Sequence, residues 1–367
     1  MHFTIQREAL LKPLQLVAGV VERRQTLPVL SNVLLVVQGQ QLSLTGTDLE
    51  VELVGRVQLE EPAEPGEITV PARKLMDICK SLPNDALIDI KLDDAKLVVK
   101  AGRSRFTLST LPANDFPTVE EGPGSLTFNL VQSKLRRLIE RTSFAMAQQD
   151  VRYYLNGMLL EVSAGILRAV ATDGHRLAMC SMTAEIEQAD RHQVIVPRKG
   201  ILELARLLTE QDGIVSIVLG QHHIRATTGE FTFTSKLVDG KFPDYERVLP
   251  KGGDKLVLGD RQALREAFSR TAILSNEKYR GIRLQLAPGQ LKIQANNPEQ
   301  EEAEEEISVD YNGGSLEIGF NVSYLLDVLG VMTTEQVRLI LSDSNSSALV
   351  QESDNDDSAY VVMPMRL

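Results

Sequence analysis

The sequence predicts an α+β fold made of three homologous domains, because two patterns recur in it at one spacing. The first pattern is a hairpin that ends in a short polar turn, and these turns begin at Thr47, Thr172 and Asn296. The turns are 125 and 124 residues apart, so almost no insertion separates the copies. The second pattern is an apolar strand that runs into an amphipathic helix, in segments that start at Thr69, Val194 and Ile318. Such recurrence indicates that a whole unit has been duplicated.

The length of the chain agrees with this division. One third of 367 residues is close to the commonest domain size of about 100 to 150 residues. Two turn-rich segments with few apolar residues, 120–125 and 249–254, lie where the repeats predict boundaries. We therefore expect domains at residues 1–122, 128–247 and 255–367.

Each copy is expected to run helix, strands, helix, strands, with its helices on one side of antiparallel sheets. The expected helices cover residues 7–20, 73–82, 132–147, 198–210, 261–273 and 321–332. In the third of these, Leu135 and Leu138 follow the apolar spacing, while Lys134, Arg137 and Arg141 form a basic stripe. Pro13 lacks a backbone donor and predicts a kink or a restart in the first helix.

The strands are expected to form antiparallel hairpins. In the third copy, Ile282, Leu284 and Leu286 alternate with polar residues before the turn 287–289, and Leu291 and Ile293 alternate after it. Alternation on both sides of a short Pro-Gly turn is typical of two paired strands with one buried face.

Charge is divided between the helices and the rest of the chain. The net charge is −11, yet the six expected helices carry fifteen basic and only seven acidic side chains. A basic helical face on an acidic protein should attract phosphate along that face and repel it elsewhere. Solvated Lys and Arg are the alternative, but they do not explain why Glu, an equally good helix former, is scarce.

The composition also limits the kind of nucleic-acid contact. There is no Trp, aromatic residues are 5% of the chain, and a cation adjoins a pair of aromatic residues at Arg152-Tyr153-Tyr154. Base stacking along a single strand is therefore not expected, and neither a recognition helix nor a zinc module is apparent. The sequence favours contact with the duplex backbone, independent of base sequence.

Two clusters could suggest an enzymatic or a metal site. Asp173-Gly174-His175 lacks a nucleophile elbow or phosphate loop near it and is not repeated in the other copies. His222 and His223 are neighbours on an expected strand, so their side chains should point to opposite faces, and no third ligand has useful spacing. We expect neither catalysis nor a metal nor any other cofactor.

The remaining features point to a cytosolic protein. No segment approaches the about 20 apolar residues of a membrane span, and the first repeat opens the sequence without a signal peptide before it. Cys79 and Cys180 lie in different copies without metal-ligand spacing, so both are expected to be buried thiols.

Five features together closely resemble the bacterial sliding clamps, the beta subunits of DNA polymerase III. They are the triplication and the segments ATDGHRLA from Ala171, KFPDYERVLP from Lys241, LPANDFP from Leu111 and YVVMPMRL from Tyr360. The resemblance covers the whole chain. It implies the DNA clamp fold and a head-to-tail homodimeric ring, with helices on the inner face and sheets outside. It also implies a processivity factor that encircles duplex DNA, tethers DNA polymerases and repair factors, and is opened and closed by a clamp loader.

The family pattern places duplex contacts on the basic surface and on a tyrosine pair. The implied residues are Arg24, Arg73, Gln149, Tyr153 and Tyr154, with Arg198 and Lys199 added from the second basic helix. Ordinary core packing is the alternative for the two tyrosines.

The resemblance also implies one pocket, between the second and third domains, that binds a short peptide with a Gln and a Leu-Phe-like end. This pocket would serve DNA polymerase III, other polymerases, the clamp loader, and mismatch-repair and ligase-type factors. Its flexible methionines suit several apolar anchors, and Pro364 marks an extended tail. The matching positions are Leu155, Thr172, Gly174, His175, Arg176, Leu177, Pro243, Arg247, Val248, Asn321, Tyr324, Ser347, Val361, Met363, Pro364, Met365 and Arg366.

Ring closure requires complementary ends, and the first and third domains carry opposite charges. The implied interface residues of the first domain are Lys74, Arg103, Arg105, Phe106 and Leu108. Those of the third domain are Ile273, Leu274, Glu301, Glu302, Glu304 and Glu305. Two alternatives remain. The acidic segment could be a solvated edge strand that resists aggregation, and the protein could be a triplicated peptide-binding scaffold that never surrounds DNA.

Overall fold

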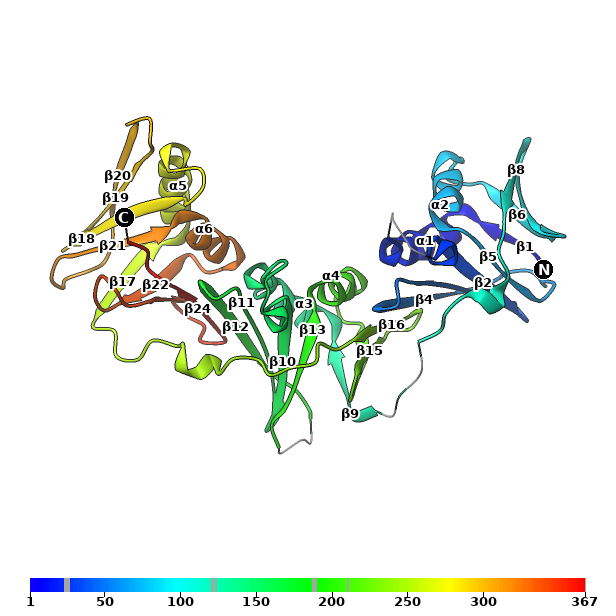
Figure 1. Cartoon of the computed structure of the whole chain (residues 1–367), viewed down its shortest axis with the longest axis horizontal. Coiled ribbons are helices and arrows are strands. Elements are labelled where there is room, and N and C mark those ends of the chain that lie inside the picture. The colour runs from blue at the N-terminus through cyan, green and yellow to red at the C-terminus, as the bar shows by residue number, and fades with distance from the viewer. Residues whose placement is uncertain (23–26, 120–121, 123, 187–189, 210, 367) are drawn as a thin grey trace. The chain divides into compact units, whose positions relative to one another are not determined.

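A computed structural model gives the fold of residues 1–22, 27–119, 122, 124–186, 190–209 and 211–366. Two compact units make up the chain, one of Met1–Leu135 with Lys199–Leu237 and the other of Arg136–Arg198 with Val238–Leu367. Figure 1 shows helices lying against twisted sheets in each unit. None of the described helices is long and apolar enough to span a membrane.

The same order of elements occurs three times among the described residues. In the first copy the elements are β1 (His2–Gln6), α1 (Arg7–Val20), β2 (Asn32–Gln38), β3 (Gln41–Thr47), β4 (Val51–Gln58), β5 (Gly66–Pro71), α2 (Ala72–Ser81), β6 (Leu87–Asp93), β7 (Lys96–Ala101) and β8 (Ser104–Ser109).

The second and third copies repeat this order of strands and helices. The second copy has β9 (Gly124–Val131), α3 (Gln132–Glu140), β10 (Gly157–Ser163), β11 (Ile166–Thr172), β12 (Arg176–Thr183), β13 (His192–Pro197), α4 (Arg198–Leu207), β14 (Ile214–Gly220), β15 (His223–Thr227) and β16 (Phe231–Lys236). The third has β17 (Lys255–Asp260), α5 (Arg261–Thr271), β18 (Gly281–Ala287), β19 (Gln290–Asn296), β20 (Glu302–Ser308), β21 (Leu316–Asn321), α6 (Val322–Val331), β22 (Gln336–Leu341), β23 (Ala348–Glu352) and β24 (Ser358–Val362).

Short 3-10 turns join several of these elements. They are η1 (Pro28–Ser31), η2 (Ala113–Asp115), η3 (Ser143–Ala145), η4 (Tyr153–Leu155), η5 (Tyr245–Arg247) and η6 (Ala272–Leu274).

Every copy contributes two four-stranded antiparallel half-sheets. The first unit contains a sheet ordered β1-β6-β7-β8 and an eight-stranded sheet ordered β5-β2-β3-β4-β16-β15-β14-β9. The second contains β13-β10-β11-β12-β24-β23-β22-β17 and β20-β19-β18-β21. Each eight-stranded sheet takes four strands from the second copy, which is why both units include part of it. The predicted α+β class, the antiparallel hairpins and the triplication are confirmed.

Helix α1 packs closely on its sheet because the strands beneath it carry glycines. A Cβ at Gly46 of β3 would lie 2.8 Å from the carbonyl oxygen of Val17, and one at Gly55 of β4 would lie 3.1 Å from the Cβ of Pro13. The restart expected at Pro13 does not occur, since α1 runs unbroken from Arg7 to Val20. The proline ring is buried close to Gly55, and the helix continues past the missing backbone donor.

The third predicted helix was too long. Helix α3 ends at Glu140, and η3 follows it. The Thr142 hydroxyl donates to the carbonyl oxygen of Leu138 at 2.8 Å, and such a side-chain bond competes with continuation of the backbone ladder. Helix α4 likewise ends at Leu207 instead of 210.

Both cysteines are buried, as expected, with the thiols of Cys79 and Cys180 free. Burial raises the pKa of the Cys79 thiol to about 11, against a smaller lowering by the nearby Arg7 charge. The pKa of Cys180 is raised by burial as well. Burial and a raised pKa fit a structural role for both thiols.

Candidate nucleic-acid and peptide interfaces

The predicted basic stripe on α3 is only partly exposed. Lys134 and Arg137 face solvent, but the Arg141 side chain is 4% exposed. Its Nη1 lies 2.8 Å from Glu352 Oε2, and its Nη2 donates to Thr333 Oγ1 at 2.8 Å. Arg141 directly follows α3 and joins the second copy to the third, so the prediction that it belongs to a basic surface was wrong. A buried cation must have a partner, and here the partner comes from a strand distant in sequence.

Other candidate duplex contacts differ in whether their positive charge is paired with a carboxylate of the same chain. Arg73 is exposed, and its guanidinium donates to the carbonyl oxygen of Val21 at 3.3 Å. Lys199 instead pairs with Asp48 and, at 2.9 Å, with Glu22. Burial lowers the pKa of Lys199, but the hydrogen bonds to Asp48 and Glu22 outweigh it and raise the pKa overall. Arg24 lies outside the described residues.

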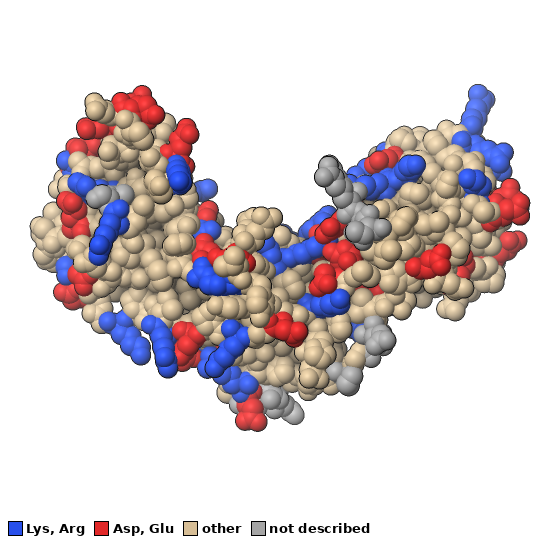
Figure 2. All heavy atoms as spheres, viewed as in Figure 1, with Lys and Arg blue, Asp and Glu red and all other residues tan. Residues whose placement is uncertain are grey.

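Figure 2 shows Lys and Arg side chains gathered where α4 lies in Figure 1, with acidic side chains among them. Arg198 and Lys199 begin this helix. Part of its charge is neutralised within the chain, because Arg206 also pairs with Glu203 at 3.0 Å. The positive face is weaker than the residue count alone predicted.

The segment that carries Gln149, Tyr153 and Tyr154 is a tightly braced turn. Asp150 binds the Arg152 guanidinium through Oδ2 at 2.8 Å, and this hydrogen bond lowers the pKa of Asp150 to about 2. The Asn156 amide donates to the carbonyl oxygen of Asp150 at 2.9 Å. Tyr153 is 58% exposed, so core packing does not explain it, whereas Tyr154 is half-buried. The turn presents Gln149 and Tyr153 to solvent.

Several predicted peptide-pocket residues lie together. Leu177, Val361 and Val248 join one apolar cluster with Tyr154 and Tyr245. The 241–250 segment covers this cluster, and the hydroxyl of Tyr245 donates to Glu161 Oε1 at 2.9 Å. That buried carboxylate also accepts from Arg191 and Gln193 at 2.6 Å each, so the segment is anchored by polar as well as apolar contacts.

A hollow of about 620 Å³ adjoins the end of this segment. Arg247, Val248 and Ser347 line it, as the resemblance implied, and the Arg247 side chain is 85% exposed. Pro250, Lys251, Ile340, Leu341 and Asn345 line it too and were not predicted as contacts. No sequence motif predicts Ile340 or Leu341 as lining residues. They line the hollow because β22 ends beside it.

The Asp173-Gly174-His175 segment is a structural turn. Asp173 Oδ1 accepts from the backbone nitrogens of His175 and Arg176 at 2.9 and 3.1 Å. The Arg176 guanidinium lies 5.2 Å from the Phe144 ring centre and 4.6 Å from that of Tyr324. The His175 ring stacks on Tyr324 at 6.4 Å. Backbone turns and an aromatic clamp account for these residue types without acid or base chemistry.

The remaining pocket candidates are spread over this part of the structure. Leu155 is buried, Thr172 donates to the carbonyl oxygen of Arg176, Pro243 is exposed and Asn321 caps α6 through Ser323. The tail leaves β24 as predicted for Pro364: Met363 N donates to the His175 carbonyl oxygen at 2.9 Å, and Met365 N to that of Gly319 at 2.9 Å. Met365 and Arg366 line a different hollow, beside Tyr279. The structure thus separates them from Leu177 and Val361.

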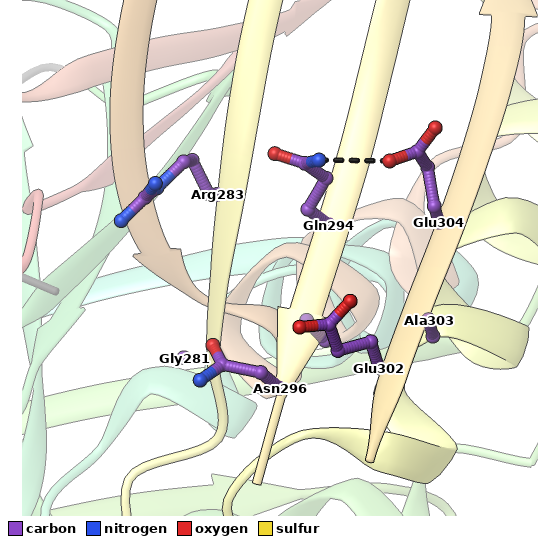
Figure 3. A pocket seen from close by; sticks show the side chains of 8 residues that line it. Gly281, Arg283, Gln294, Asn296, Glu302, Ala303 and Glu304 are labelled. Atoms are coloured by element: carbon purple, nitrogen blue, oxygen red, sulfur yellow. Dashed lines mark hydrogen bonds between the residues drawn. The ribbon is translucent and has the colours of Figure 1, made fainter. Parts of the chain in front are cut away.

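Some interface candidates lie on the edge strands β8 and β20, and others lie outside the strands, such as Lys74 of α2 and Ile273 and Leu274 of η6. Phe106 is half-buried and Leu108 buried on β8, where Arg105 is exposed, and Ile273 of η6 is 75% exposed. On β20, Glu302 and Glu304 face solvent and line a hollow of about 310 Å³. Figure 3 shows Glu304 beside Gln294 and Glu302 beside Asn296, with Arg283 on the strand beyond them. Glu305 points to the other face, where it pairs with Arg270 of α5. Among the described residues, no group of three His, Cys, Asp or Glu side chains could hold a metal ion.

Comparison with known proteins finds matches to one family along nearly the whole chain. Family profiles of the DNA polymerase III beta subunit match its N-terminal domain at residues 1–120, its central domain at 129–244 and its C-terminal domain at 246–366. A beta sliding clamp from Pseudomonas putida is 93% identical and one from Escherichia coli K12 is 56% identical, each over all of both chains. The crystal structure of the DNA polymerase III subunit beta from Pseudomonas aeruginosa is 88% identical and superposes with a TM-score of 0.98, covering both chains fully. The chain therefore belongs to the DNA polymerase III beta subunit family, the beta sliding clamps.

Proposed function

We propose that this chain, a non-catalytic processivity factor of DNA polymerase III, closes into a head-to-tail homodimeric ring around duplex DNA. The ring would place helices inside and sheets outside. Its domains would be residues 1–122, 128–247 and 255–367, and it would act in the cytoplasm. One observation carries the proposal: the way in which the copies already join within the chain.

The two junctions between copies are formed by equivalent pairs of strands. At the first, β4 pairs antiparallel with β16, and Arg56 N donates to the Glu230 carbonyl oxygen at 2.9 Å. At the second, β12 pairs with β24, and Ser181 N donates to the Asp357 carbonyl oxygen at 2.8 Å. By position in the sheets, β20 is the third equivalent of β4 and β12, and β8 is the third equivalent of β16 and β24. Within these two sets of equivalent strands, β8 and β20 are the ones that have no partner strand from another copy in the sheets of the described residues.

Both junctions predict one register for β8 of a second copy against β20. The ladders make Glu306 equivalent to Arg56 and Ser181, and Arg103 equivalent to Glu230 and Asp357. Glu306 would therefore donate its backbone N–H to Arg103, which sets Arg105 opposite Glu304 and Phe106 opposite Ala303. Directly opposed residues share a face, so opposite charges would meet over the hollow of Figure 3.

Apolar contacts would support this charged row on the other face. Phe106 and Leu108 would adjoin Ala303, with Lys74, Ile273, Leu274, Glu301 and Glu305 nearby. Burial is needed because exposed ion pairs contribute only about 0 to 1 kcal/mol each. A ring closed this way leaves neither edge strand exposed to aggregation.

Within the ring, Arg73, Gln149, Tyr153, Tyr154, Arg198 and Lys199, with Arg24 beyond the described residues, are the proposed duplex contacts. Contact with phosphate is weak and independent of sequence, so it permits sliding while the closed ring prevents release.

Partner proteins would bind elsewhere, at the cluster of Leu177, Val248 and Val361 and the hollow beside Ser347. An apolar cluster next to an open hollow suits a short peptide with apolar anchors. DNA polymerase III, other polymerases, the clamp loader, and mismatch-repair and ligase-type factors would share this site in turn.

Retention of labelled protein on nicked circular DNA, compared with the same DNA linearised, tests encirclement. The protein is loaded with a cognate loader and ATP and then held at high salt. Retention on circles with rapid loss from free ends is expected. Equal loss from both would mean simple electrostatic binding and would leave the peptide-binding scaffold in its place.

A further inference from the structure

Two turns at equivalent places in the second and third copies share a sequence pattern. The first is Asp150-Val151-Arg152-Tyr153 and the second is Asn276-Glu277-Lys278-Tyr279. Each lies shortly before an equivalent strand, because Gly157 pairs with the last residue of β13 and Gly281 with the last residue of β21. In both turns an Asp or Asn is followed by an exposed residue, a basic residue and a tyrosine.

The two turns also share a backbone geometry. Asp150 Oδ1 accepts from Arg152 N at 2.8 Å, and Asn276 Oδ1 accepts from Lys278 N at 3.0 Å. These Asx turns fix the following side chains on the surface. The tyrosines end up equally open, with Tyr153 58% and Tyr279 56% exposed.

The two cations differ in whether a neighbouring carboxylate neutralises them, and only a cation that is not neutralised can attract an anion strongly. The Arg152 guanidinium is neutralised by Asp150, at 3.0 Å from Nε to Oδ1 and 2.8 Å from Nη2 to Oδ2. Asn276 is neutral and offers Lys278 no such partner. Glu277 is exposed beside it, yet no ion pair of Lys278 is found among the described residues. The Lys278 ammonium lies 5.2 Å from the Tyr279 ring centre instead, and its charge stays open to solvent.

A second cation stands close to the same tyrosine. Tyr279 and Arg366 line one hollow of about 480 Å³, together with the amide-bearing Asn276 and Asn296. Asn297 lines it too, but its amide already donates to Glu301 Oε2 at 2.6 Å. Ammonium, guanidinium, hydroxyl and amide groups all donate hydrogen bonds, so this surface fits an anion with several acceptor oxygens.

We propose that the Asn276–Tyr279 turn is a further duplex-contact site, in which Lys278 and Tyr279 bind backbone phosphate. The inference rests on the proposed encirclement and on the proposed role of the equivalent Tyr153 turn, and it adds a contact from the third domain. Lys278 supplies the charge, and the Tyr279 hydroxyl donates to a phosphate oxygen. The contact carries no sequence information.

A pair of reciprocal substitutions tests this without removing either cation. Asn276→Asp keeps the Asx acceptor but sets a carboxylate beside Lys278, whereas Asp150→Asn releases Arg152. Binding of the full-length protein to a labelled linear duplex is measured by anisotropy over a range of salt concentrations. Asn276→Asp and Lys278→Gln should each weaken binding and reduce the slope of log K against log [salt] by about 0.9 for each phosphate that the protein no longer neutralises. Asp150→Asn should strengthen binding.

Lys91→Gln is the matched control, since Lys91 is exposed on β6 and loses the same charge. Lysine acetylation followed by mass spectrometry gives a second measurement on protein loaded onto nicked circles. Lys278 should be protected by DNA and Lys91 should not. Equal acetylation of Lys278 in free and loaded protein, or an unchanged salt slope in Lys278→Gln, would overturn the proposal. If the protein without substitutions were lost from nicked circles as fast as from linear DNA, encirclement itself would be rejected.

Discussion

Arg141 and Glu352 form a buried ion pair, with 2.8 Å between Nη1 and Oε2 and side chains 4% and 1% exposed. The pair joins the residue that follows α3 in the second copy to the end of β23 in the third. Thr333 completes it, since its backbone nitrogen donates to Glu352 Oε1 at 2.6 Å. Removing one partner leaves a buried charge unpaired, which is the costly case for an ion pair.

Arg141→Met should therefore lower the free energy of unfolding of the second unit by about 3 to 5 kcal/mol. Lys236→Met is the control, because the exposed Lys236–Glu50 pair at 3.3 Å should contribute about 0 to 1 kcal/mol. Urea denaturation followed by circular dichroism measures both. Similar losses of unfolding free energy in the two variants would show that the buried pair contributes no more to stability than the exposed pair.

Stability should also depend on pH through Glu352. Burial raises the pKa of this carboxyl, but the hydrogen bonds from Arg141 and Thr333 outweigh it, so the folded pKa lies below the ordinary 4.5. The resulting stabilisation is complete above pH 4.5 and is lost as the pH falls through the folded pKa. Glu352→Gln should be less stable at pH 7 and show a shallower loss of stability in acid. Thermal unfolding between pH 7 and 3 measures this, and parallel curves for the two proteins would contradict it.

Alkylation should spare both thiols in the folded protein. The pKa of Cys79 near 11 leaves almost no thiolate at pH 8, and Cys180 is equally shielded by burial. Iodoacetamide treatment followed by mass spectrometry should find both unmodified without denaturant and both modified in guanidinium chloride. Rapid labelling of either thiol in native protein would place it at an open surface.

Charge reversal should test the register proposed for the ring. Arg105→Glu sets like charges opposite each other and should weaken dimerisation at least tenfold, since such contacts cost several kcal/mol. Glu304→Arg should do the same. The double variant should recover much of the loss if these residues face each other, as sedimentation equilibrium would measure. Additive losses in the double variant would reject this register.

The proposed peptide site can be blocked by filling its hollow. Ser347→Trp should abolish most binding of a peptide with a Gln and a Leu-Phe-like end, while the exposed Ser344, which does not line the hollow, gives Ser344→Trp as the control. Fluorescence anisotropy measures binding and thermal melting checks the fold. Unchanged affinity in Ser347→Trp would exclude the hollow as the peptide site.

Local patterns in the sequence determined the repeated unit, the six helices and the hairpins. Alternation at Ile282, Leu284 and Leu286 reports a buried strand face directly, because neighbours along a strand decide which side chains share a face. The family resemblance rested on longer segments, such as 241–250, whose residues cover the apolar cluster around Tyr245.

Tertiary structure alone decided which of the basic helical residues stay free. Arg141 and Lys134 look alike in the sequence, yet Arg141 is neutralised by Glu352, which lies more than 200 residues away. The pairings of β4 with β16 and of β12 with β24 were equally invisible. Edge strands and buried charges find their partners through packing between copies, and periodicity along the chain carries no information about a partner so far away.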